Sequence, residues 1–242
     1  MLEINSKNNQ KIKDACALKI KKYRQEQGLF LMEGIKNLDM ALKFGQVKQI
    51  FTTIDLPKLP KEIEVFRVND EVLKKLASSE NPEGVVFVSK MQEPKNIDKC
   101  AYHKLVYLDQ VNDPGNLGTI LRTAVAFNYD AVILSKGSVD LYNEKTIAAS
   151  KGAIFLIDAF YDDLKNYTNG RKVIVTTLDE RSIFLKDSPK FDDFVIVLGN
   201  ESHGVSKEVM DQADTFVKID MNDSIDSLNV AVAAGIIMNY FK

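Results

Sequence analysis

Six short apolar runs alternate with helical patterns in the C-terminal part of the chain. They occupy residues 105–108, 131–134, 153–157, 173–175, 194–198 and 216–219. Because consecutive positions in each run are apolar, they predict strands that are buried on both faces. Alternation of such strands with helices is typical of a mostly parallel sheet covered by helices. We therefore predict an α/β fold for this part.

The N-terminal part mixes helical and strand patterns in a smaller α/β arrangement. The periodicity of apolar positions predicts helices over 7–27, 33–44 and 70–77, and strands over 47–53, 63–67 and 84–90. The polar stretch 91–99 contains a proline and no periodic apolar pattern, as a linker does. We therefore predict two domains, 1–97 and 98–242, and expect the second to fold alone.

The last predicted helix, about 227–241, is apolar around most of its circumference. Its apolar residues are Val230, Val232, Ala233, Ala234, Ile236, Ile237 and Met238. Such a helix needs burial on more than one side. We expect its own sheet to cover one side and a second copy of the chain to cover another, with Ile237 at that interface.

Composition narrows the class of protein. The chain has 242 residues, of which 45% are apolar, so it can form a sizeable core. It shows neither an apolar N-terminal signal segment nor a long uncharged span, which argues against export and membrane insertion. The two cysteines and two histidines have no metal-ligand spacing. We expect a cytoplasmic protein without a metal.

The charge is distributed unevenly along the chain. The net charge is −2, but residues 1–97 carry 17 Lys or Arg against 13 Asp or Glu, and residues 98–242 carry 15 against 21. Residues 1–24 alone hold seven cations and two acids. This pattern predicts a helix that faces RNA phosphates, with Lys13, Lys21, Lys22 and Arg24 as candidate contacts. The alternative is a solvated, lysine-decorated helix face.

The segment 112–124 reads as a turn from a strand into a helix, built around a ligand. Pro114 and Gly115 suit the turn, and Asn116 can cap the helix. Gly118 and Arg122, four residues apart, share a face that a polar or anionic ligand could approach. The alternative is a well-capped core helix with a surface arginine.

Two further segments place small and polar residues directly after a strand. In 199–205, two glycines permit tight turning, and Glu201 stands just beyond the strand end, where α/β sheets bind ligands. In 219–230, Ser227 or Asp226 can cap the last helix, and Asn229 stands in its first turn. The structural alternatives are a helix-favouring acid at 201 and simple capping residues at 226–229.

Taken in order, N-x-G-x-x-x-R-x-A, L-G-N-E-x-x-G and I-x-M-(x)5-S-L-N-V resemble the motifs of the SpoU/TrmH family of RNA ribose methyltransferases in the SPOUT superfamily. The resemblance covers residues 104–242. Residues 5–97, with Phe-Leu-Met-Glu-Gly at 30–34 after a basic helix, resemble the small ribosomal-protein-like RNA-binding domain that many members carry.

The resemblance implies a deep trefoil knot, a homodimer with active sites completed across the interface, and S-adenosylmethionine as cofactor. Family roles map onto the following catalytic and cofactor positions. The catalytic set is Asn116, Arg122, Glu201, Ser227 and Asn229; the cofactor set is Thr177, Leu198, Gly199, Ile219, Met221 and Leu228. Many members have proline where this chain has Asp220, which puts the rigidity of that loop and the affinity for the cofactor in question.

The implied reaction is 2'-O-methylation of RNA ribose, with ribosomal RNA the expected substrate and transfer RNA the alternative. A second alternative is an RNA-binding protein of the same fold without catalysis. No G-x-G-x-x-G follows the strand at 105–108, and no P-loop motif is present, which argues against a dinucleotide oxidoreductase or an NTPase. Because Arg122 stays protonated, we expect it to stabilise the developing oxyanion rather than act as a base.

Overall fold

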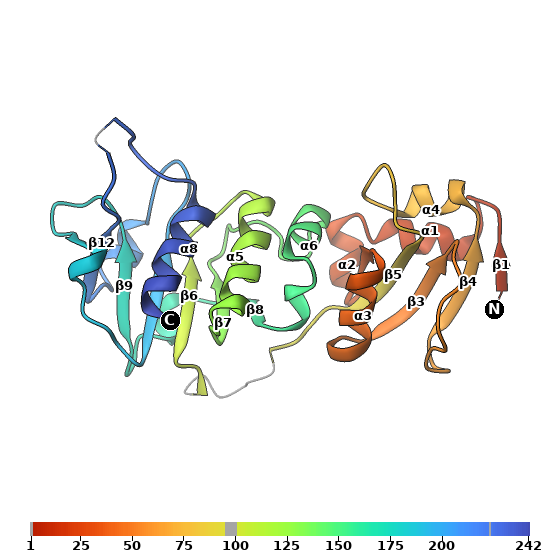
Figure 1. Cartoon of the computed structure of the whole chain (residues 1–242), viewed down its shortest axis with the longest axis horizontal. Coiled ribbons are helices and arrows are strands. Elements are labelled where there is room, and N and C mark those ends of the chain that lie inside the picture. The colour runs from red at the N-terminus through yellow and green to blue at the C-terminus, as the bar shows by residue number, and fades with distance from the viewer. Residues whose placement is uncertain (1, 95–100, 223) are drawn as a thin grey trace. The chain divides into compact units, whose positions relative to one another are not determined.

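The computed structural model describes residues 2–94, 101–222 and 224–242 (Figure 1). They form two compact units. The first comprises Met1–Gln92 and Tyr142–Phe155, and the second comprises Glu93–Leu141 and Leu156–Lys242. The predicted linker 91–99 lies partly outside the described residues. The division between the two units falls close to this linker. The internal segment Tyr142–Phe155 also belongs to the first unit.

The first unit is a five-stranded sheet with helices packed on it, in the strand order β1-β4-β3-β5-β2. Its strands are β1 Leu2–Ile4, β2 Leu29–Glu33, β3 Val47–Thr52, β4 Glu64–Val68 and β5 Val85–Lys90. Its helices are α1 Gln10–Ala17, α2 Lys21–Gln27, α3 Ile35–Phe44, α4 Asp70–Leu76 and α6 Glu144–Ser150. The helix predicted over 7–27 is therefore two helices, and β1 and β2 were not predicted. Their short length gives them little alternation to detect.

The segment 142–155 packs on the sheet of the first unit, although it follows that sheet by many residues in the sequence. The ring of Phe30 lies 4.9 Å from that of Tyr142 and 5.9 Å from that of Phe155, centroid to centroid. Phe30 and Phe155 are both 0% exposed. The strand predicted over 153–157 is wrong, because Ala153–Phe155 form a 3-10 turn whose side chains fill this core.

The second unit is a seven-stranded parallel sheet, which confirms the predicted architecture. The strand order is β10-β12-β9-β11-β6-β7-β8. The strands are β6 Lys104–Leu108, β7 Ala131–Leu134, β8 Asp158–Tyr161, β9 Lys172–Thr176, β10 Ile183–Phe184, β11 Phe194–Leu198 and β12 Thr215–Lys218. The helices are α5 Pro114–Ala126, α7 Lys207–Met210 and α8 Val230–Phe241, and 3-10 turns occur at Leu164–Asn166 and Leu185–Asp187.

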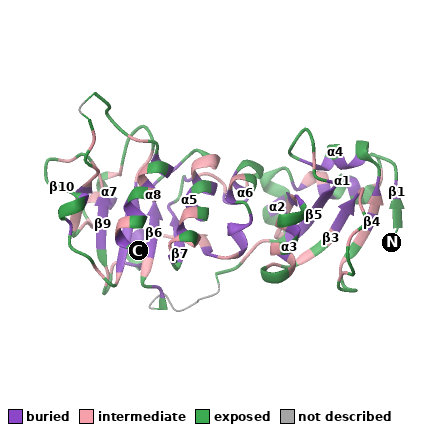
Figure 2. Cartoon of the chain, viewed as in Figure 1, coloured by how far each residue is buried: buried purple, intermediate pink, exposed green. Residues whose placement is uncertain are grey.

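The central strands of this sheet are buried along their length (Figure 2). Every residue of β7 and β11 is buried, as the unbroken apolar runs predicted. α5 and α8 pack against each other, and α8 also contacts β11. The sheet is thus a rigid platform whose strand ends can position loops.

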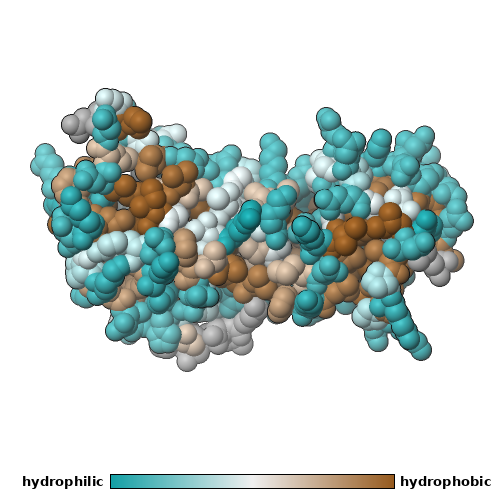
Figure 3. Space-filling view, in the orientation of Figure 1, coloured by the Kyte–Doolittle hydropathy of each residue, from teal (hydrophilic) through white to brown (hydrophobic). Residues whose placement is uncertain are grey.

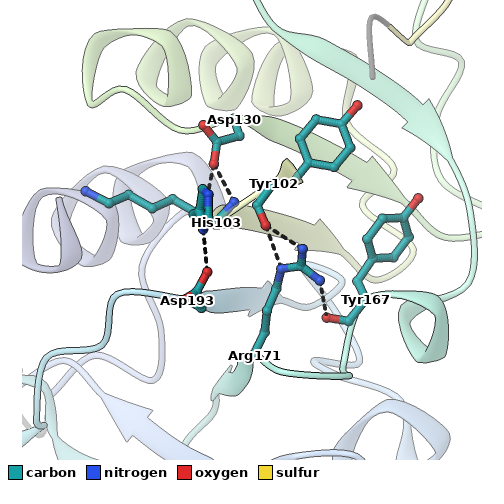
Figure 4. A network of polar contacts seen from close by, with 7 residues as sticks. Tyr102, His103, Asp130, Tyr167, Arg171 and Asp193 are labelled. Atoms are coloured by element: carbon teal, nitrogen blue, oxygen red, sulfur yellow. Dashed lines mark hydrogen bonds and ion pairs between the residues drawn. The ribbon is translucent and has the colours of Figure 1, made fainter. Parts of the chain in front are cut away.

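Polar contacts hold the amino ends of four strands (Figure 4). The carboxylate of Asp130 accepts hydrogen bonds from the backbone N–H groups of His103 and Lys104, at 2.7 and 2.8 Å. The imidazole of His103 contacts Asp193, and the guanidinium of Arg171 donates to the backbone oxygens of Tyr102 and Tyr167. This network fixes the amino ends of these strands. The loops that carry the predicted catalytic residues leave the sheet at the opposite, carboxyl ends of the strands.

Among the residues that the structure describes, no helix is long and apolar enough to cross a membrane. In the same residues, no group of three or more His, Cys, Asp or Glu side chains is placed to hold a metal ion.

We predict that Phe155→Ala destabilises the first unit, although residue 155 is distant from it in sequence. Loss of a fully buried phenylalanine typically costs about 3–5 kcal/mol. Hydrogen exchange measured by mass spectrometry should show lost protection in β2 and α3 and unchanged protection in β6 and β11.

Phe160→Ala is the matched control, because the ring of Phe160 packs in the second unit, 6.2 Å from Tyr102 and 6.1 Å from Tyr167. It should reduce protection in the second unit instead. Equal loss in both units from Phe155→Ala would contradict the assignment of this segment.

Candidate active site

Three loops that carry the predicted catalytic residues leave the second unit's sheet at its carboxyl edge. The first follows β6 and enters α5, the second follows β11, and the third runs from β12 to α8. Asp113 caps α5 by accepting the backbone N–H of Asn116 at 2.7 Å. The sequence-based expectation that Asn116 caps this helix is therefore wrong. The side chain of Asn116 is left available for other contacts.

A row of hydrogen bonds joins all three loops. Asn229 Nδ2 donates to Asn116 Oδ1 at 2.9 Å, and Asn116 Nδ2 donates to Glu201 Oε1 at 2.9 Å. Asn229 is also the N-cap of α8, because its Oδ1 accepts the backbone N–H groups of Ala231 and Val232. The predicted caps Ser227 and Asp226 precede this position. Three of the five predicted catalytic residues thus form one connected group.

Glu201 holds the loop after β11 against the loop after β6. Besides Asn116, the backbone N–H groups of Asn112 and Asp113 approach its carboxylate, at 3.3 and 3.4 Å. Burial opposes the negative charge of Glu201, but these hydrogen bonds outweigh that effect and hold the pKa of Glu201 below its usual value. The carboxylate therefore stays ionised and bound at neutral pH.

The loop that carries Glu201 needs glycine where β11 ends. A Cβ at Gly199 would lie 2.3 Å from the carbonyl carbon of Gly204 and 2.4 Å from the nitrogen of Val205. This close approach lets Asn200 and Gly204 exchange two backbone hydrogen bonds of 2.9 and 3.0 Å. The turn presents Glu201 toward α5.

Sequence reasoning missed Asn200 and Asp109, which anchor the two ends of the same loop. Asn200 Nδ2 donates to the backbone oxygen of Gln110 at 2.7 Å. The buried carboxylate of Asp109 accepts the backbone N–H of Ser206 at 2.7 Å. The signal for both was available: Asp109 directly follows an apolar strand run, and Asn200 follows another after a single glycine.

An apolar cavity of about 140 Å³ lies beside these loops. Four of the six predicted cofactor positions line it, together with Ser227. These four are Thr177, Ile219, Met221 and Leu228. Leu198 and Gly199 lie at the end of β11 and do not line the cavity. Ile237 is 2% exposed and lines the cavity as well. The sequence-based expectation that it faces a second chain is therefore wrong.

This cavity fits part of S-adenosylmethionine. Its volume is below the range of about 300–1,000 Å³ that whole small-molecule sites occupy, and its lining of Leu and Ile side chains suits a flat heterocycle. An adjoining hollow of about 390 Å³ shares Leu178, Ile219 and Met221 with it and contains Asp220. Asp220 Oδ2 lies 3.4 Å from Lys186 Nζ, so an ion pair stands where many family members have proline.

Arg122 lies apart from the row. It is exposed on α5, and no side chain in the described ranges forms a hydrogen bond or ion pair with its guanidinium. It stands six positions after Asn116, which places the two about 120° apart around the helix. Within one chain, Arg122 and Asn116 therefore face different directions. His203 is exposed as well, with Nδ1 3.3 Å from Asn200 Oδ1.

The four candidate RNA contacts differ in their environment. Lys13, Lys21 and Lys22 are exposed. Arg24 is only 4% exposed, and its Nη1 donates to the backbone oxygens of Leu18 and Lys19 at 2.9 and 2.8 Å. The assignment of Arg24 to RNA is therefore corrected, since its guanidinium binds the carbonyls that end α1.

Solved structures of similar fold identify the class. The AdoMet-bound rRNA methyltransferase from Sinorhizobium meliloti is similar with a TM-score of 0.88 at 29% identity, over 98% of this chain and 96% of that one. A putative RNA methyltransferase of the TrmH family from Porphyromonas gingivalis gives 0.83 at 28% identity, over 96% of each chain. The protein is thus an RNA methyltransferase with the SPOUT fold.

Within that class, the chain belongs to the SpoU rRNA Methylase family, whose model matches residues 103–239. Residues 9–86 match the model of the MRM3-like substrate binding domain. The chain is also 32% identical, over the full length of both proteins, to the 23S rRNA (guanosine(2553)-2'-O)-methyltransferase RlmP of Bacillus subtilis (strain 168). The family resemblance of the three motifs is confirmed.

We predict that Glu201 stabilises the fold in a pH-dependent manner. Because the pKa of Glu201 is lowered from 4.5 in the folded chain, its contribution is complete above about pH 4.5. It is lost as the pH falls through the folded value. The difference in free energy of unfolding between wild type and Glu201→Gln should shrink over that range in denaturant titrations.

The control is Glu208→Gln, on the neighbouring helix α7, which should show no such shrinkage. A Glu201→Gln difference that stays constant from pH 7 down to pH 3 would contradict the role assigned to the ionised carboxylate.

Proposed function

We propose that this protein transfers a methyl group from S-adenosylmethionine to a ribose 2'-hydroxyl of ribosomal RNA. The row from Asn229 through Asn116 to Glu201 carries the proposal, because it gathers three loops beside a cavity of suitable lining. The rRNA methyltransferases named among its relatives, one of them bound to AdoMet, support the substrate and the cofactor. We place this activity in the cytoplasm.

The cofactor is held by Thr177, Ile219, Met221 and Leu228 around the cavity, with Leu198 and Gly199 forming the adjacent strand end. When bound, S-adenosylmethionine supplies an electrophilic methyl group on a sulfonium. The proposal includes the deep trefoil knot implied by the family resemblance, with the cavity-lining loops belonging to the knot. No metal is required, because the leaving group is already cationic.

The amides of Asn116 and Asn229 and the hydroxyl of Ser227 orient the ribose, so that its 2'-oxygen lines up with the methyl group. Such positioning is a large part of catalysis for a weak nucleophile. Glu201 acts as a positioning residue rather than as a general base. Its carboxylate is engaged by Asn116 and backbone N–H groups, and its lowered pKa makes it a poor proton acceptor at neutral pH.

Arg122 supplies the positive charge that stabilises the developing oxyanion, and the proton of the 2'-hydroxyl passes to water. Because it faces away from Asn116 on α5, it serves the site of a second copy of the chain. The active site is then completed across a homodimer interface formed by α5 and α8.

The exposed side of α8 supports this dimer. Val232 is 52% exposed and Ile236 41%, on a helix that packs against α5. Hydrophobic surface gathers over the part of the second unit where α8 lies (Figure 3). A second copy that covers this surface removes it from water and brings Arg122 to the neighbouring site.

The substrate is tested by mapping 2'-O-methyl groups in total RNA from cells with and without the gene. Loss of a site in ribosomal RNA supports the proposal, and loss only in transfer RNA would replace the substrate. A transfer assay with labelled cofactor on purified RNA separates an active enzyme from an RNA-binding protein without catalysis.

We predict that Arg122→Ala reduces methyl transfer by about 100- to 1,000-fold, the loss typical of one oxyanion-stabilising donor. Binding of S-adenosylmethionine, measured by calorimetry, should be nearly unchanged, since Arg122 does not line the cavity. Arg122→Lys keeps the charge and should retain more activity. Turnover like that of wild type would remove Arg122 from the mechanism.

We predict that the wild-type protein is a dimer by light scattering and that Ile236→Glu is a monomer without transfer activity. A carboxylate placed in an apolar interface loses hydration without a partner. Ile35→Glu is the matched control, because Ile35 is 40% exposed but lies on α3 of the first unit. An active wild-type monomer at assay concentration would refute the dimer and the role of Ile236 together.

A further inference from the structure

The corner between α1 and α2 exposes apolar and basic side chains together. Ile20 is 56% exposed and Tyr23 is 39% exposed, and Lys21 and Lys22 between them are exposed as well. Ile20 is the extended N-cap residue of α2, and Tyr23 stands three residues later in the first turn of that helix. Large apolar side chains gathered on a surface with like charges mark a binding site more often than single exposed ones do.

Buried contacts hold this corner in place. Arg24 binds the backbone oxygens of Leu18 and Lys19, and Lys19 Nζ donates to the backbone oxygen of Ala77 at 2.7 Å. The chain is thus tied to the end of α1 and to the residue that follows α4. Such pre-organisation reduces the entropy lost when a ligand binds to the exposed residues.

The charge around Tyr23 favours a polyanion. Lys22 Nζ lies 6.0 Å from the centre of the Tyr23 ring and 3.9 Å from Glu26 Oε1, in an exposed ion pair of little strength. Lys21 forms no ion pair with any residue in the described ranges. An aromatic ring beside available ammonium groups matches a nucleic acid strand, which offers both base faces and phosphates.

We infer that Tyr23, with Ile20 beside it, is a stacking platform for an unpaired base of the RNA substrate, and that Lys21 and Lys22 hold adjacent phosphates. A base inside a duplex cannot present its face to a tyrosine, whereas a base in a loop or single strand can. The first unit therefore selects looped or single-stranded RNA. This inference rests on the proposed function for RNA as the substrate and adds the structural class of that RNA.

Fluorescence anisotropy with the full-length protein tests the platform. The probes are a single-stranded RNA, a hairpin with an unpaired loop and a blunt duplex of equal length, each titrated over a series of salt concentrations. Tyr23→Ala should weaken binding of the first two probes by about 5- to 150-fold, the range for one stacked base, and leave duplex binding nearly unchanged.

The salt dependence separates stacking from charge. Tyr23→Ala should leave the slope of log affinity against log salt unchanged. Lys21→Ala and Lys22→Ala should each reduce the magnitude of this slope by about 0.7 for the single-stranded RNA. Tyr23→Phe should bind like wild type. Tyr23→Leu, which keeps apolar volume without an aromatic face, should bind like Tyr23→Ala and guards against a folding defect.

Phe44→Ala is the matched control, because Phe44 is an exposed aromatic of the same unit, 51% exposed at the end of α3. The inference is overturned if Tyr23→Ala has no effect, if it weakens duplex binding equally, or if Phe44→Ala has the same effect. The binding assay contains no cofactor and does not depend on methyl transfer. A protein that binds these RNAs as expected but transfers no methyl group would contradict the proposed function and leave the stacking platform supported.

Discussion

The hydrogen bonds that run from Asn229 to Asn116 and on to Glu201 are the constraint on which the second unit's site depends. Which group donates and which accepts in this row is determined at Asn229. Because Asn229 Oδ1 accepts the first N–H groups of α8, its amide nitrogen must point to Asn116. Asn116 then offers its own nitrogen to Glu201. The start of one helix thereby sets the orientation of side chains on two other loops. Removal of any member would leave a polar group without its partner, which costs more than the bond itself contributes.

The same row explains how the loop after β11 can carry a carboxylate that no cation among the described residues pairs with. Backbone N–H groups at the start of α5 and the amide of Asn116 together replace the water that Glu201 loses. Asp109 and Asn200 anchor the two ends of this loop to the segment after β6. Arg122, the arginine of the family motif, forms no ion pair with any residue in the described part of the chain, and it lies exposed on α5.

In the first unit, the buried cation Arg24 has a structural role. Arg24 closes the end of α1 and positions the turn before α2. Its charge therefore supports the exposed corner without contacting a ligand. The segment 142–155 completes the core of this unit through Tyr142 and Phe155. A fragment that begins at residue 98 would leave these side chains without Phe30, so the C-terminal part is less self-sufficient than its pattern suggested.

Local pattern was sufficient for the parallel sheet, because a strand buried on both faces needs an unbroken apolar run, and the runs at 131–134 and 194–198 meet that need. The order and spacing of three motifs were sufficient for the family. Pattern could not separate Arg24 from Lys21, or Ile237 from Ile236, because residues of one kind in one helix differ only in what packs against them. Nor could it assign Phe155 to a core formed more than a hundred residues earlier, or choose Asn229 over Ser227 as the cap. Burial is set by the packing of the whole fold, and the amide nitrogen of Asn229 is bound by Asn116 from a distant segment, so these assignments were decided by tertiary structure.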